Sequence, residues 1–239
     1  MDDNMKLHWK LHFEEFPNEK LLKAFDNPIK SYLNTKSGNI LDIGSGQSLY
    51  LLDMLESQFN LFAVDIEKSQ LDYLKERVKQ AGFDESRITY STEYFPSPNF
   101  DNYIFQAIII SDLLHFFKKS DAHAFVTQIK KYCIAGTLII GKVHSTNHFV
   151  SQEEITPDSY FKSFYDKDDI LAMFPESEFK LLSFIQEDSE FTLEITEFIK
   201  YWIHEVLKED HTTHQIKLIE KDYLEDSREN FIKFVVMKK

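Results

Sequence analysis

A glycine-rich stretch near the start of the chain has the residue types that bind a nucleoside. Residues 39–48 read NILDIGSGQS, an apolar run that Asp42 interrupts and that Gly44 and Gly46 end. Glycine has no Cβ, so its backbone can approach a ligand closely. Asp65 ends the next apolar run, 23 residues after Asp42, and an acid at about this separation suits the two hydroxyls of a ribose. The order strand, glycine turn, helix, strand and acid predicts a nucleoside-binding unit.

These residues also allow purely structural interpretations. The two glycines could form a tight turn without a ligand, and Asp65 could cap the helix that follows it. A dinucleotide site would require Gly-x-Gly-x-x-Gly, but Leu49 occupies the place of the third glycine. A Rossmann-type NAD-dependent oxidoreductase is therefore disfavoured, although it stays an alternative.

A second group of candidate residues follows a later apolar run. Residues 105–111, FQAIIIS, have the composition of a strand that is buried on both faces. Ser111 and Asp112 come at its end, where ligands bind in sheets of this kind. His115 follows three residues later and is either a general base or a residue that packs or caps a helix.

A further strand is expected at residues 137–143, and His144 and His148 follow it. Both histidines are candidate general bases. The polar, turn-rich residues 144–165 contain five aromatic side chains and are interpreted as a lid with aromatic walls over the acceptor. The alternative is an ordinary long connection whose aromatic residues anchor it to the core.

The motifs ILDIGSG, residues 40–46, and LFAVDIEKSQLDYLKERV, residues 61–78, resemble the first two motifs of the class I S-adenosylmethionine-dependent methyltransferases. Residues 111–117 resemble the fourth motif. The resemblance implies that S-adenosylmethionine is the cofactor, with its methionine part at Asp42 and its ribose at Asp65. The implied cofactor-binding residues are Asp42, Gly44, Ser45, Gly46, Asp65, Ile66, Glu93 and Ser111, and the catalytic candidates are Asp112, His115 and His144.

Three positions depart from the family pattern or match it loosely. Ser48 stands where the family usually has glycine, and Gln106 stands where many members have aspartate. Glu93 is the nearest match to a family residue that contacts adenine, but it could equally be a solvated loop acid.

The resemblance implies methyl transfer to a small-molecule N, O or S nucleophile. The aromatic segment followed by a late strand is similar to methyltransferases that act on thiopurines and tellurite. A non-catalytic S-adenosylmethionine-binding regulatory or partner protein is the main alternative, because Gln106 departs from the pattern and no catalytic motif is recognised.

Composition narrows the possible partners. The chain has 239 residues and a net charge of −13, which disfavours duplex nucleic acid as a partner. Cys133 is the only cysteine, which fits a reducing compartment, and a cytoplasmic location is expected. No membrane span is expected. No metal site is expected either, because the pair His8 and His12 lacks a third ligand.

The predicted fold is a single α/β domain with a Rossmann-like, doubly wound, mostly parallel sheet of seven strands whose last strand is antiparallel. Its parts are an N-terminal helical cover (1–37), a donor-binding core (38–187), a helical insertion (188–230) and the last strand (231–239). The insertion contains an amphipathic helix around Trp202 that could form a homodimer contact. Helices are expected at 18–25, 47–59, 67–80, 122–133, 166–174 and 190–208, and strands at 39–43, 61–64, 88–90, 105–111, 137–143, 179–185 and 231–237.

Overall fold

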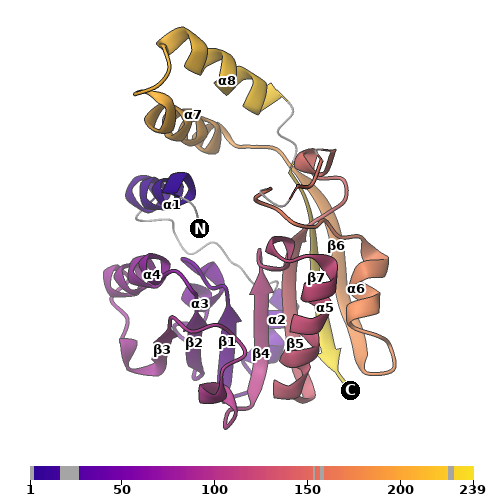
Figure 1. Cartoon of the computed structure of the whole chain (residues 1–239). Coiled ribbons are helices and arrows are strands. Elements are labelled where there is room, and N and C mark those ends of the chain that lie inside the picture. Colours follow the sequence, from indigo (N-terminus) through magenta and orange to yellow (C-terminus); the bar gives the residue numbers. More distant parts are fainter. Residues whose placement is uncertain (1–2, 17–26, 153, 157–158, 226–228) are drawn as a thin grey trace.

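The computed structural model describes residues 3–16, 27–152, 154–156, 159–225 and 229–239, and its centre is a seven-stranded sheet (Figure 1). The strands lie in the order β3-β2-β1-β4-β5-β7-β6. β7 runs antiparallel to both β5 and β6, and the other pairs are parallel. The predicted fold class is therefore confirmed. The strands are β1 (Asn39–Ile43), β2 (Asn60–Val64), β3 (Ile88–Ser91), β4 (Phe105–Ser111), β5 (Cys133–His144), β6 (Phe179–Ser189) and β7 (Glu229–Lys238).

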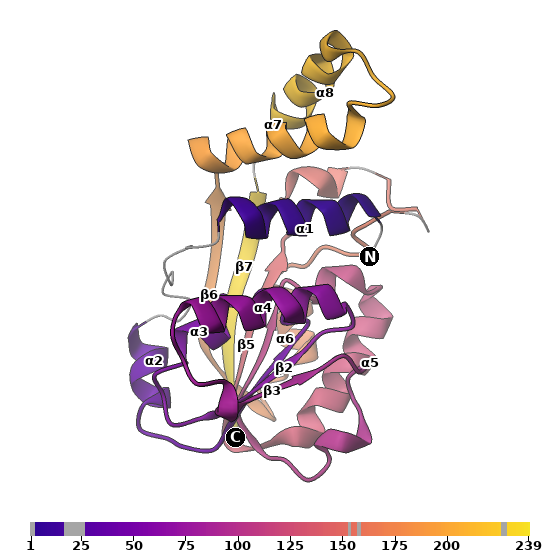
Figure 2. The same ribbon diagram turned by 90° about the vertical axis from the view of Figure 1, so that its left-hand side faces the viewer.

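Helices cover both faces of the sheet (Figures 1 and 2). Leu41 and Ile43 of β1 pack toward α5 and α6, whereas Ile40, on the opposite face, packs toward α2, α3 and α4. This alternation follows from the two-residue period of a strand, and it explains why the central strands are apolar throughout. The helices are α1 (Asp3–Glu15), α2 (Asn27–Leu33), α3 (Leu49–Asp53), α4 (Lys68–Gln80), α5 (Lys119–Ile129), α6 (Lys167–Met173), α7 (Leu193–Leu207) and α8 (Thr213–Glu225).

The predicted helix at 47–59 is too long, because α3 ends at Asp53. Beyond it, the backbone carbonyls find partners outside a helix. The guanidinium of Arg87 donates to the carbonyl oxygens of Leu55 and Phe59, and the hydroxyl of Ser57 donates to that of Met54 at 2.6 Å. These bonds take the place of helical hydrogen bonds.

The boundary between α5 and β5 also differs from the prediction. α5 ends at Ile129, earlier than the predicted 133, and Gly136 lies inside β5 rather than at a helix end. The hydroxyl of Thr137 accepts the N–H of Ile134 and donates to the carbonyl of Phe105 at 2.8 Å. These bonds join the first half of the strand to β4. The helix predicted at 18–25 lies outside the described residues.

The insertion after β6 consists of two helices, α7 and α8. Both lie beyond the end of the sheet at which β6 finishes (Figure 1). α1 packs beneath them around Leu11 and Phe198 (Figure 2). Trp202 of α7 donates its Nε1–H to the carbonyl of Asn4 in α1 at 3.2 Å. The surface proposed for a homodimer thus has a partner within the chain.

We predict that Gly141→Ala destabilises the protein by about 1–3 kcal/mol, the usual cost of overpacking a core. A Cβ at Gly141 would come within 2.2 Å of the ring of Phe234, its neighbour on β7. Urea unfolding measures the loss. In a Phe234→Leu background the same glycine substitution should cost less. An equal cost in both backgrounds would show that the Phe234 ring is not the reason why position 141 requires glycine.

Candidate active site

The glycine turn joins the end of β1 to the start of α3. Gly44 and Ser45 donate their backbone N–H groups to the carbonyl of Val64 at 2.8 and 3.0 Å, which fixes the turn against the end of β2. Gly44 has a φ of +67°, and a Cβ there would lie 2.8 Å from the side chain of Leu113. Glycine is therefore required for two reasons, backbone conformation and contact with the loop that follows β4. Sequence reasoning missed Leu113, since an apolar loop residue gives no chemical signal.

Asp42 lies buried beneath this turn. Its carboxylate accepts a short hydrogen bond from the hydroxyl of Ser48, and the same hydroxyl oxygen accepts the N–H of Leu51 as the N-cap of α3. At the place where the family usually has glycine, Ser48 therefore binds Asp42 and caps α3. Burial raises the pKa of Asp42 to about 7, and the nearby carboxylates of Asp65 and Asp112 contribute to the increase.

Asp65 ties the glycine turn to the start of α4. Its two carboxylate oxygens accept the N–H groups of Gly46 and Glu67, each at 2.8 Å. Burial raises the pKa of Asp65, against the effect of these two hydrogen bonds. Each oxygen retains a further lone pair for a ligand hydroxyl. Asp65 therefore binds free N–H groups at the start of α4, as the structural interpretation expects. Its remaining lone pairs are compatible with the predicted binding of ribose hydroxyls.

Ile66 and Glu93 have different surroundings. The side chain of Ile66 is an exposed apolar group, 53% accessible, immediately after Asp65. Glu93 is held within its own loop, where it accepts hydrogen bonds from Ser97 and Asn99. Glu93 therefore orders the loop after β3 in this structure, whereas Ile66 presents a free apolar surface.

Gln106 lies at the opposite end of β4 from the candidate site. It is the second residue of the strand, and its side chain lies where a Cβ at Gly38, which precedes β1, would come within 3.3 Å of it. Ser111, at the other end, closes the strand. The departure from the family at Gln106 therefore leaves the ligand-binding edge unchanged, and it no longer favours a non-catalytic protein.

Asp112 follows β4 in the left-handed region, with a φ of 53°. Its N–H donates to the carbonyl of Lys142 at 2.8 Å, and its carboxylate accepts from the hydroxyl of Ser111 and pairs with the Lys142 ammonium at 3.2 Å. Non-glycine residues with positive φ are concentrated at functional sites. Sequence reasoning missed Lys142, although a lysine inside the apolar run TLIIGKV was an available signal.

Three imidazole rings lie in a stack beside Asp112. The ring centroids of His115 and His144 are 4.0 Å apart, and those of His144 and His148 are 4.2 Å apart. Phe161 contacts all three rings from the side. Burial lowers the pKa of His115 to about 3 and of His148 to about 4, and it lowers that of His144 further. At neutral pH the imidazoles are uncharged.

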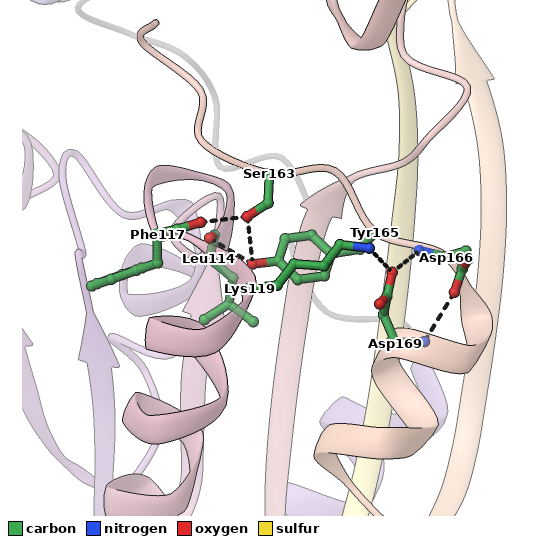
Figure 3. A network of polar contacts seen from close by, with 7 residues as sticks. All are labelled: Leu114, Phe117, Lys119, Ser163, Tyr165, Asp166 and Asp169. Carbon is green, nitrogen blue, oxygen red and sulfur yellow. Dashed lines mark hydrogen bonds and ion pairs between the residues drawn. The ribbon is translucent and has the colours of Figure 1, made fainter. Parts of the chain in front are cut away.

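The described part of residues 144–165 contains little regular structure, and its end is anchored to the loop after β4 (Figure 3). The hydroxyl of Tyr165 donates to the carbonyl of Leu114 at 2.8 Å, and that of Ser163 donates to Phe117. The backbone N–H of Lys162 donates to the carbonyl of His115 at 2.7 Å, and that of Tyr165 donates to the carbonyl of His144 at 3.0 Å. The segment thus positions the two histidines, whereas its role as a lid stays a prediction.

Beside this segment lies a cavity of about 300 Å³. It is separate from the glycine turn and from Asp65, since neither contributes to its walls. Lysine, hydroxyl and apolar side chains line it, namely Lys118, Lys119, Thr146, Ser151, Ile155, Lys162, Ser163 and Phe164.

The N-terminal helix α1 contacts the glycine turn. Gln47, within the turn, donates from its side-chain amide to the carbonyl of Trp9 at 3.1 Å. The guanidinium of Arg77 in α4 bonds both the Gln47 side chain and the carbonyl of Phe16. Residues of the predicted N-terminal cover thus contact the turn directly.

Comparisons with known proteins agree with this geometry. Residues 40–136 match a family described as "Methyltransferase domain". No curated protein matches the sequence. No helix within the described ranges has the length and apolar character needed to cross a membrane.

Three solved structures are similar in fold. A proposed sarcosine dimethylglycine methyltransferase of Galdieria sulphuraria has a TM-score of 0.64 at 9% identity, with 96% of this chain and 97% of that chain covered. TehB of Haemophilus influenzae has a TM-score of 0.57 at 11% identity, with 94% of this chain and 66% of that chain covered. The [4+2]-cyclase SpnF has a TM-score of 0.59 at 15% identity, with 84% and 74% covered.

Residues 40–136 match the methyltransferase-domain family, and the fold is shared with solved methyltransferase structures. The match confirms the resemblance of the sequence motifs to S-adenosylmethionine-dependent methyltransferases and is consistent with S-adenosylmethionine as the cofactor. The roles of the individual site residues stay predictions.

We predict that Asp42→Asn stabilises the folded protein at pH 8 and has little effect at pH 4. A folded-state pKa raised from 3.8 to about 7 means that ionising Asp42 disfavours the folded state, so stability declines as pH rises from about 4 to 7 and then levels off. Asparagine cannot ionise, so the substitution removes this loss of folding stability, which is worth at most about 4 kcal/mol. Urea unfolding at both pH values measures it. Equal effects at pH 4 and pH 8 would contradict the buried-carboxylate explanation.

Proposed function

We propose that this protein transfers the methyl group of S-adenosylmethionine to a small-molecule N, O or S nucleophile. The observation that carries the proposal is the convergence of Asp42, Asp65 and Asp112 around the glycine turn, because three carboxylates suit a ligand that carries a sulfonium and an ammonium group. The sulfonium already activates the methyl group, so the protein mainly aligns the nucleophile, methyl and sulfur.

The donor would lie along the edge formed by the ends of β1, β2 and β4. Asp42 would hold the methionine ammonium, and Asp65 would accept the ribose hydroxyls with its remaining lone pairs. Ile66 would cover one face of adenine with its exposed side chain. Ser45 supports this placement, since its hydroxyl is buried and has no hydrogen-bond partner among the described residues.

The acceptor would approach beside Ser111 and Asp112, where the reactive end of the donor would lie. Asp112, His115 and His144 are the candidate catalytic residues, and a base is needed only if the acceptor arrives protonated. The aromatic side chains of Phe116, Tyr160 and Phe161 contact one another next to His115, and they support an acceptor with an apolar part. The single cysteine supports a cytoplasmic location.

A second candidate function is donor binding without methyl transfer. SpnF shows that a protein with this fold can be a [4+2]-cyclase, so fold alone does not fix the reaction. A methyl-transfer assay across a metabolite panel, run on protein that binds the donor, separates the two. An oxidoreductase stays disfavoured, because Leu49 occupies the place of the third glycine of a dinucleotide site.

We predict that Asp65→Ala lowers the affinity for S-adenosylhomocysteine at least tenfold, about 1.4 kcal/mol. Calorimetry measures it, and Asp72→Ala, at an exposed carboxylate on α4, serves as the control. Because Asp65 also holds the turn, the substitution is repeated with the 2′,3′-dideoxy analogue of the ligand. A smaller loss for the analogue indicates contact with the ribose. An equal loss for both ligands would assign Asp65 to the turn alone.

We also predict that donor binding releases protons near pH 7. An ammonium group beside Asp42 favours its ionised form, so the pKa of about 7 falls when the donor binds. Calorimetry in two buffers with different ionisation enthalpies detects the release as a difference in binding enthalpy. Asp42→Asn should remove the difference. Identical enthalpies for the unaltered protein in both buffers would show that the ammonium group binds elsewhere.

A further inference from the structure

Three side chains at the sheet edge have the arrangement of metal ligands. One carboxylate oxygen of Asp112 and one ring nitrogen from each of His115 and His144 all lie within 4.8 Å of one another. They come from different places in the fold: the end of β4, the turn at residues 114–116 and the end of β5. We propose that Asp112, His115 and His144 together bind one divalent transition-metal ion.

The hydrogen bonding of the histidines supports this assignment independently. His115 is 2% exposed and His144 is 8% exposed. The Nδ1 atom of each is buried without a hydrogen-bond partner among the described residues. A buried polar atom without a partner is costly and calls for a reason. A metal ion would give these imidazoles a partner in place of the water they have lost.

The backbone around the three residues is well fixed. The N–H of Asp112 donates to the carbonyl of Lys142, which joins the ends of β4 and β5. The carbonyls of His115 and His144 accept the N–H groups of Lys162 and Tyr165. A metal site needs such support, since its ligands must hold their positions closely.

The ligand types indicate which ion would bind. Imidazole suits zinc and iron, whereas calcium and magnesium prefer oxygen ligands. Two histidines and one carboxylate leave positions open for other ligands, as in catalytic zinc sites and non-haem Fe(II) sites. The structure therefore favours Zn²⁺ or Fe²⁺.

Lys142 is the group that opposes metal binding. Its ammonium pairs with Asp112 at 3.2 Å and lies 3.8 Å from the ring centroid of Phe231. A metal ion must displace the ammonium from the carboxylate. The Phe231 ring can retain the displaced cation through its π face.

If the proposed methyl transfer is correct, the open positions of the metal would face the acceptor. A bound ion lowers the pKa of a coordinated O, N or S group and so prepares it for attack on the methyl carbon. The metal site itself does not depend on that reaction. It is therefore tested in the absence of donor and acceptor.

Titration of the full-length, EDTA-treated protein with Co²⁺, followed by visible absorption, tests the proposal. We expect one equivalent to bind with the d–d bands of nitrogen and oxygen ligands, and Zn²⁺ to displace it. His115→Gln and His144→Gln should each weaken binding at least about tenfold, since even outer-shell changes cost 10–100-fold. His123→Gln, on α5, is the matched control and should bind like the unaltered protein.

Lys142→Met provides a test in the opposite direction, because removing the competing ammonium should tighten Co²⁺ binding. Circular dichroism confirms that each variant is folded. No binding at concentrations up to about 100 μM Co²⁺ or Zn²⁺ would overturn the proposal. Binding that His115→Gln and His144→Gln leave unchanged would also overturn it. Donor binding measured in EDTA tests the methyltransferase assignment separately.

Discussion

Parallel pairing of β1, β2, β4 and β5 is the constraint on which the site depends. The register aligns Ile43 with Val64, and Ser111 with Lys142, so the ends of neighbouring strands reach one edge together. Residues far apart in the chain therefore meet without a long connecting loop. The turn after β1, the acid after β2 and the aspartate after β4 are neighbours because their strands are.

Three carboxylates at this edge of the sheet favour cationic ligands over anionic ones. Asp42, Asp65 and Asp112 lie close enough that the second and third raise the pKa of the first. Placing three carboxylates close together is unfavourable in a chain that already carries a net charge of −13. A cationic ligand offsets part of that repulsion. The same arrangement would repel an anionic dinucleotide, which agrees with the absence of a third glycine at Leu49.

The sequence allowed prediction of features that local pattern determines. The strand at 105–111, the helix at 166–174 and the spacing from Asp42 to Asp65 follow from composition and period, and the structure has the first two as predicted, with Asp166 and Phe174 as the caps of α6. Features that depend on long-range contacts could not be derived. The early end of α3 depends on Arg87, which is remote in sequence and donates to the carbonyl of Leu55.

The histidine stack shows the limit of sequence reasoning most clearly. The sequence presents His115 and His144 only as separate candidate bases, and its most visible histidine pair, His8 and His12, has no third ligand for a metal. In the structure, His8 and His12 of α1 pack against Phe198 of α7, and His8 also contacts Trp202. The convergence of Asp112, His115 and His144 arises instead from the pairing of β4 with β5 and from the return of residues 162–165. A search by sequence spacing cannot find such a site, since sheet register, rather than chain separation, sets the distances between its members.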